Sequence, residues 1–65
     1  SFASSENLIV IKTSSGTASA VAEAIDSLNW NEILGTIAGD NTILVVAESK
    51  KVVKDILERF EEILR

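Results

Sequence analysis

The chain contains no cysteine, no histidine and no proline. Without cysteine, disulfide bonds and thiolate metal sites are excluded, and nothing indicates the redox state of the compartment. Without histidine, metal binding or acid–base chemistry near pH 7 would have to use carboxylates or an unusual lysine. A catalytic serine triad is excluded because Ser14, Ser15 and Ser19 have no histidine base.

Long apolar runs are also lacking. None approaches the roughly 20 residues that a membrane-spanning helix needs, and no signal peptide precedes the first strand. We therefore expect a cytoplasmic protein with no membrane partner. At 65 residues the chain is one domain, 1–65, near the lower limit for a single core. It begins at Ser1 without Met, so we expect a piece of a longer protein.

Positive charge is scarce: six basic residues face ten acidic ones, and the formal net charge is −4. The basic residues lie mostly in the C-terminal third, interleaved with acids. A nucleic-acid surface needs a basic stripe that displaces counterions, and this chain has none. An acidic domain suits a cationic ligand or partner instead.

What is present is a set of apolar segments with clear periods. Residues 8–11 form a continuous apolar run, which is typical of a strand buried on both faces. Residues 14–17 break it and offer candidate N-caps, and residues 17–28 then show helical spacing. A final helix is predicted over residues 50–64, with Ser49 as its cap. Its core stripe is Val53, Ile56, Leu57, Phe60 and Leu64, widened by Val52 and Ile63, with ion pairs Asp55–Arg59 and Glu61–Arg65.

Two β-branched apolar runs, Ile33–Ala38 and Thr42–Ala47, flank the turn formers Gly39-Asp40-Asn41. Gly tolerates positive φ, and Asp and Asn tolerate it better than most, so this stretch predicts a tight β-hairpin. Gly35 inside the first run indicates a bulge or a close backbone approach. Trp30 either closes the core over the end of the first helix or anchors an interface.

The predicted order is β-α-β-β-α. Two helices cover one face of a small sheet, yet all three predicted strands are apolar on both faces. A bare apolar sheet face usually marks an interface, and a chain this small gains most from association. We therefore expect an oligomer of identical subunits that bury the second sheet face.

Two carboxylates are candidates for ligand binding. Asp26 lies in the last turn of the first helix, where an anion opposes the helix dipole. It is either a tolerated surface residue or a group held for a cation. Asp40, in the hairpin turn, suits a guanidinium, which prefers a carboxylate, and segment 13–17 offers N–H groups or hydroxyls to an anion. The spacing does not show that these groups converge.

Residues 34–43, Leu-Gly-Thr-Ile-Ala-Gly-Asp-Asn-Thr-Ile, resemble the G-T-I-x-G-D-[DN]-T signature of the C-terminal domain of bacterial arginine repressors. Residues 10–18 resemble that family's strand and T-x-x-G turn into a helix, and Asp26-Ser27-Leu28 resembles its D-[SN]-L helix end. The resemblance covers essentially the whole chain. It implies an α+β two-layer sandwich of order β-β-α-β-β-α, with residues 1–5 belonging to a clipped first strand.

The resemblance also implies trimers that stack into a hexamer, with L-arginine as corepressor at the trimer–trimer interface and no other cofactor or metal. Operator DNA would be bound by a separate N-terminal winged-helix domain absent from this chain. Asp40 matches the aspartate that takes the guanidinium from the opposite trimer, and Asp26 matches the one that holds the α-amino group. Asn41 matches a position that is often Asp, so one charge-assisted contact is in doubt. The remaining matched positions are Thr36 and Ala38, on the strand lining the site, and Ser19, where other members carry Gln or His.

The leading hypothesis is therefore a non-enzymatic sensor and oligomerisation domain of a transcriptional repressor of arginine biosynthesis, in which arginine acts allosterically on the tethered DNA-binding domains. Two alternatives stay open: a purely structural oligomerisation module, and a regulatory domain for another amino acid.

Overall fold

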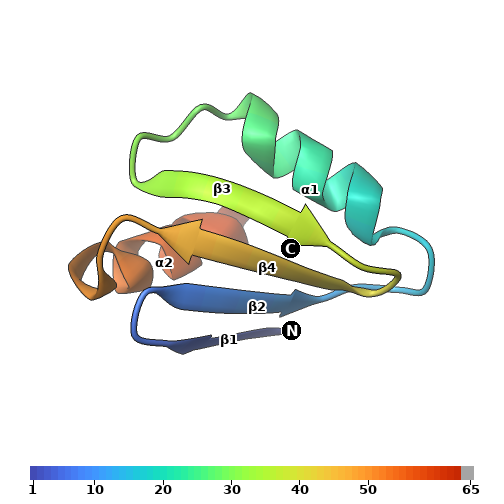
Figure 1. Cartoon of the computed structure of the whole chain (residues 1–65), viewed down its shortest axis with the longest axis horizontal. Coiled ribbons are helices and arrows are strands. Elements are labelled where there is room, and N and C mark those ends of the chain that lie inside the picture. Colours follow the sequence, from blue (N-terminus) through green and yellow to red (C-terminus); the bar gives the residue numbers. More distant parts are fainter. Residues whose placement is uncertain (64–65) are drawn as a thin grey trace.

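The structure is a computed structural model that describes residues 1–63, and it consists of a four-stranded sheet with two helices (Figure 1). The elements in chain order are β1 (Phe2–Ser5), β2 (Leu8–Lys12), α1 (Ala18–Ser27), β3 (Ile33–Ala38), β4 (Thr42–Ala47), the short 3-10 helix η1 (Lys50–Val52) and α2 (Val53–Ile63). The strand order is β1-β2-β4-β3, and every neighbouring pair is antiparallel. The predicted α+β two-layer class is confirmed.

One face of the sheet is closed by both helices. Alternate residues of β2 and β4 point to this face because side chains in a strand alternate between its two sides. They meet the inner residues of α1 and α2 in one buried cluster: Ile9, Ile11, Ile43, Val45 and Ala47 from the sheet, and Ala18, Ala22, Ile25, Val53, Ile56 and Phe60 from the helices. This is the core of the domain.

The opposite face, which we call the open face, has no covering element among residues 1–63. The strand register places Val10, Leu44 and Ile37 side by side across β2, β4 and β3, and Leu8 beside Val46. Ile37 is 71% exposed and Leu8 is 39% exposed, whereas the other three are half-buried. The strands are thus apolar on both faces, as their sequences predict, but a single chain buries only one of them.

The residue pattern alone does not predict the first strand, β1. Residues 1–5 are mostly polar and show no strand period, so the order β-α-β-β-α lacks β1. In the structure Phe2–Ser5 pairs along β2, from Phe2 opposite Ile11 to Ser5 opposite Leu8. The order is therefore β-β-α-β-β-α, as the family resemblance implies. Pairing with an apolar neighbour, and not the segment's own composition, makes it a strand.

The hairpin between β3 and β4 has the predicted bounds. The register shifts between Ile33 and Gly35, so Leu34 forms a bulge and is 69% exposed. The turn closes with the N–H of Gly39 on the carbonyl oxygen of Thr42 at 2.8 Å. The prediction that the turn residues Gly39-Asp40-Asn41 adopt positive φ is wrong. The described residues with positive φ are Glu6, Gly16 and Asn29.

The last helix differs from its prediction at both ends. Its first turn is the 3-10 helix η1, and Ser49 precedes it without a capping hydrogen bond from its side chain. Val52 packs against the core as predicted, whereas Ile63 is 51% exposed and does not widen the core stripe. Leu64 lies outside the described residues, as does Arg65 of the predicted pair Glu61–Arg65.

Candidate functional site

Asp26 is placed by the way α1 ends. Asn29 adopts φ 54°, and its N–H bonds the carbonyl oxygen of Asp26 at 3.3 Å, which stops the helix just after Ser27. The exposed carboxylate of Asp26 then faces β3, where its Oδ1 accepts a hydrogen bond of 2.9 Å from the hydroxyl of Thr36. Thr36 therefore links the end of α1 to the middle of β3, and the other carboxylate oxygen of Asp26 has no partner among the described residues.

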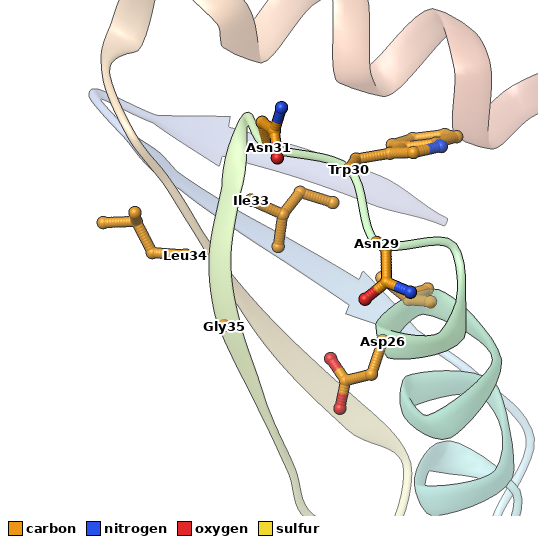
Figure 2. Close-up of a pocket in the computed structure, with 8 residues that line it drawn as sticks. Asp26, Asn29, Trp30, Asn31, Ile33, Leu34 and Gly35 are labelled. Atoms are coloured by element: carbon orange, nitrogen blue, oxygen red, sulfur yellow. The ribbon is translucent and has the colours of Figure 1, made fainter.

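A pocket of about 420 Å³ opens beside Asp26, between the end of α1 and the start of β3. Figure 2 shows the side chains of Asp26 and Asn29 on the α1 side of this pocket, facing the backbone at Gly35. A Cβ added at Gly35 would meet nothing within 4 Å, so no close backbone approach accounts for this glycine within one chain. The other residues that line the pocket are Ile25, Trp30, Asn31, Ile33 and Leu34.

Asp40 is held by the segment that precedes α1. Its backbone carbonyl accepts from the N–H of Gly16 at 3.0 Å, and its Oδ2 accepts from the hydroxyl of Ser15 at 3.0 Å. The neighbouring carbonyl of Asn41 accepts from the N–H of Thr13 at 2.7 Å. The turn is therefore fixed to segment 13–16. The carboxylate is exposed, and its Oδ1 has no hydrogen-bond partner among the described residues.

The side-chain oxygen of Asn41 has a different partner from the carboxylate of Asp40. This Oδ1 accepts from the hydroxyl of Thr42 at 2.9 Å, and Thr42 in turn accepts from the ammonium of Lys12 at 3.0 Å. The amide group of Asn41 is thus already oriented by the hydroxyl of Thr42. Its oxygen is directed toward Thr42 and not toward Asp40.

The two candidate carboxylates are not brought together within one chain. Asp26 bonds Thr36, and Asp40 lies four residues further along, which is roughly 13 Å of extended chain. Of the other predicted residues, Ala38 is half-buried against the core, and Ser19 is exposed on the first turn of α1. Ser19 makes no hydrogen bond with the other candidate residues. Segment 13–17 offers fewer N–H groups to an anion than the sequence predicts, because those of Thr13, Gly16 and Thr17 all bond backbone carbonyls.

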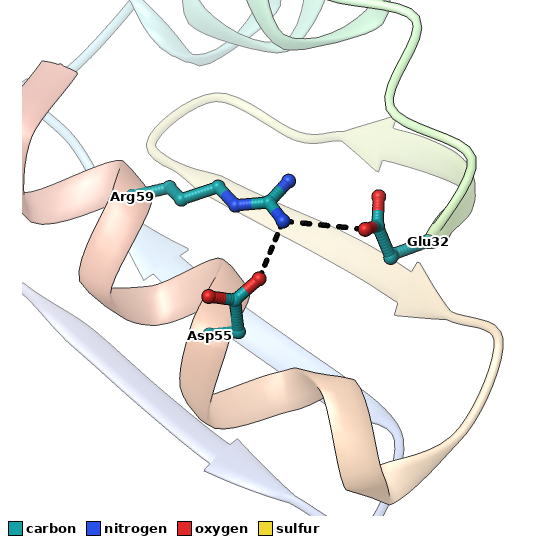
Figure 3. Close-up of polar contacts among 3 residues, drawn as sticks. All are labelled: Glu32, Asp55 and Arg59. Carbon is teal, nitrogen blue, oxygen red and sulfur yellow. Dashed lines mark hydrogen bonds and ion pairs between the residues drawn. The ribbon is translucent and has the colours of Figure 1, made fainter.

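A second polar cluster supports the loop that lines the pocket. Arg59 of α2 forms an ion pair with Glu32 at 3.2 Å and another with Asp55 (Figure 3). Its guanidinium also lies 4.9 Å from the ring centre of Trp30, which stacks on Phe60 at 5.6 Å. Trp30 therefore packs over the core after the end of α1, which is one of the two roles that the sequence predicts for it.

This cluster also lowers the pKa of Glu32. The backbone hydrogen bond to its carboxylate is the larger cause, followed by the hydrogen bond from Arg59, and the same partnership raises the pKa of Arg59. Spacing predicted Asp55–Arg59 but missed Glu32, which lies 27 residues from Arg59. The sequence offers Ser15, 25 residues from Asp40, as a helix cap or as part of segment 13–17 for an anion, and not as a partner of Asp40. No local signal in the sequence marks either contact.

Residues 1–63 contain no cluster of three acidic side chains arranged to hold a metal ion. Within the same range, no helix is long and apolar enough to cross a bilayer.

The chain is therefore an α+β domain with an open apolar sheet face and a carboxylate in its hairpin turn. The family model described as "Arginine repressor, C-terminal domain" matches residues 1–62, and the chain belongs to this family. It is 58% identical over 64 residues to the arginine repressor of Carboxydothermus hydrogenoformans, covering 98% of this chain and 43% of that protein.

Two further relatives are also arginine repressors. The chain is 56% identical to the arginine repressor of Moorella thermoacetica and 54% identical to that of Thermoanaerobacter sp. (strain X514), in each case over 59 residues, 91% of this chain and 39% of the relative. The chain thus spans about two fifths of the length of these relatives. They are named as repressors and not as enzymes.

Proposed function

We propose that this chain is the arginine-sensing and assembly domain of a transcriptional regulator of arginine metabolism, and that it performs no catalysis. In this proposal L-arginine is the ligand and no other cofactor is needed. Operator DNA is bound by a separate N-terminal domain, which fits the net charge of −4 on residues 1–65. The intact regulator would act as a repressor in the cytoplasm.

The observation that carries the proposal is the placement of the two exposed carboxylates. Asp26, in the last turn of α1, accepts from Thr36 of β3, whereas Asp40 lies in the turn after β3 and accepts from Ser15, so a single chain does not present both carboxylates to one small cation. A second copy that supplies Asp40 to the Asp26 of its neighbour would complete a site with one carboxylate for the α-amino group and one for the guanidinium. Thr36 and Ala38 would lie on the strand that lines it, with Asn41 and Ser19 at its margin.

The open face supports the assembly that this site requires. Leu8, Val10, Ile37, Leu44 and Val46 form a continuous apolar surface, and a surface of this kind on a small domain is typical of an interface. We propose that it is buried between copies in a trimer, and that two trimers associate through the arginine sites. Because the full set of ligand contacts exists only in the hexamer, arginine binding stabilises the hexamer, by about 2.7 kcal/mol per site at a hundred times Kd.

Allosteric control then follows as a coupling between two separate sites. Arginine shifts the population toward the hexamer, and the tethered DNA-binding domains are presented together only in that state. The reciprocal effect is that operator binding by the intact protein strengthens arginine binding by the same factor.

The ligand is tested by calorimetry of the purified chain with L-arginine, L-citrulline and L-lysine. Citrulline keeps the shape of arginine without its charge, and lysine keeps the charge without the planar guanidinium. Heat with arginine alone supports the proposal. Binding of a different amino acid would instead indicate a regulatory domain for that ligand, and no binding at millimolar concentrations would leave a purely structural assembly module.

Asp40→Asn tests the role of the turn. Replacing the carboxylate removes a charge-assisted contact to the guanidinium, so we expect arginine affinity to fall by about ten- to a hundredfold while the fold is kept. Glu48→Gln, which neutralises an exposed carboxylate just after β4, is the matched control and should bind as the wild type does. Unchanged binding by Asp40→Asn would refute this role of Asp40.

A further inference from the structure

The Asp40 side chain is not left to rotate freely in solvent. Segment 13–16 crosses the hairpin turn and contacts it through the N–H of Thr13, the N–H of Gly16 and the hydroxyl of Ser15. The two backbone bonds fix the turn itself. Only the bond from Ser15, 3.0 Å to Oδ2, acts on the carboxylate.

Local structure explains why Ser15 lies where it can reach. Gly16 adopts φ 80°, a left-handed conformation that glycine enters without steric cost, and the chain bends there before α1 begins. The hydroxyls of Thr13 and Thr17 both donate to the carbonyl oxygen of Ser14, at 3.1 and 2.8 Å. These bonds hold the backbone on either side of Ser15, so its hydroxyl is offered to the turn from a fixed position.

We propose that Ser15 is a positioning residue that orients the carboxylate of Asp40 for the ligand. The inference rests on the proposed function, since it concerns the same arginine site. With Oδ2 accepting from Ser15, Oδ1 has no hydrogen-bond partner among residues 1–63 and is available to a guanidinium on a neighbouring subunit. An oriented carboxylate loses less side-chain entropy on binding than a freely rotating one, and the hydroxyl does not neutralise its charge.

The neighbouring serine provides a matched control. Ser14 and Ser15 are both exposed and adjacent, yet the hydroxyl of Ser14 has no hydrogen-bonding partner among residues 1–63. Ser14→Ala therefore removes a hydroxyl from the same segment without touching Asp40. Ser15→Ala removes the one that bonds it, and Ser15→Thr keeps a hydroxyl at the same position.

The test measures arginine affinity by calorimetry for the wild type and these three variants. We expect Ser15→Ala to bind about three- to tenfold more weakly, because the carboxylate of Asp40 must then be ordered as the ligand binds. Ser14→Ala should be unchanged, and Ser15→Thr should bind near the wild-type value. If Ser15→Ala binds as well as the wild type or more tightly, or if Ser14→Ala is weakened equally, the positioning role is wrong.

A second measurement separates failure of this inference from failure of the proposed function. The carboxyl carbon of Asp40 is observed by NMR without arginine, and its chemical shift should change in Ser15→Ala but not in Ser14→Ala. An unchanged shift overturns the role of Ser15 even if the wild type binds arginine. A wild type that binds no arginine overturns both the role and the proposed function, whatever the shift shows.

Discussion

Leu44 and Val45 are consecutive residues of β4, yet they belong to opposite sides of the domain. Val45 points to the helices and is fully buried, whereas Leu44 points to the open face and remains half-exposed. The same contrast runs along β2, where Ile9 is buried and Val10 is not. The side chains on the two faces have similar apolar character, so the difference lies in what covers them. One face is completed by the chain itself, and we propose that the other is covered by a partner.

Substitution of Val45 should have the largest effect. Val45→Asp places a carboxylate among aliphatic side chains with no partner, which costs several kcal/mol, and a 65-residue domain has little stability in reserve. We expect the variant to be unfolded at 25 °C. Far-ultraviolet circular dichroism checks this, and a cooperative transition with wild-type helix content would contradict the assignment of the closed face.

The same substitution one residue earlier should act on assembly and not on the fold. Leu44→Asp puts a charge at the centre of the open face, where water solvates it in a single chain and a subunit interface does not. We expect the variant to stay folded by circular dichroism and to sediment as a monomer. Lys51→Glu, on the exposed side of η1, is the control and should assemble normally. An oligomer of unchanged mass would show that this face is not the interface.

The smallest effect is expected away from both faces, at the ion pair of Arg59. Arg59→Gln removes the ion pairs with Glu32 and Asp55 and the contact of the guanidinium with Trp30, so the melting temperature should fall by only a few degrees. Lys54→Gln removes an exposed charge from the same helix and should have no comparable effect.

The fall in melting temperature of Arg59→Gln should be larger at neutral pH than at acidic pH. The pKa of Glu32 is lowered in the folded state, so the carboxylate contributes stability above its unfolded value of 4.5 and loses that contribution as the pH falls through its folded pKa. The difference in melting temperature between wild type and Arg59→Gln should therefore be larger at pH 7 than at about pH 3. A difference that grows on acidification would contradict this account of the Glu32–Arg59 pair.

Much of this architecture could be predicted from the residues. The β-branched runs around Gly39-Asp40-Asn41 gave the hairpin its bounds, and helical spacing located both helices, because burial of one face imposes a period on the sequence. Gly35 marked the bulge correctly. Only the resemblance to the family implied β1, because residues 1–5 show no strand period.

The rest depended on contacts between distant parts of the chain. The bond from Ser15 to Asp40 and the pair of Arg59 with Glu32 join residues 25 and 27 positions apart, and no local period connects them. The strand order, with β4 between β2 and β3, likewise follows from tertiary pairing. The pattern did show that both sheet faces are apolar, which one chain alone does not satisfy. That excess of apolar surface is the strongest hint of assembly in the sequence.

The central claim is that the open face and the arginine site belong to one assembly, and the mass of the chain in solution tests it most directly. Sedimentation equilibrium is measured at fixed protein concentration with increasing L-arginine. We predict a mass of three chains that rises to six as arginine is added, with no change when L-citrulline replaces it. A monomer of 7.0 kDa at all arginine concentrations would contradict the account.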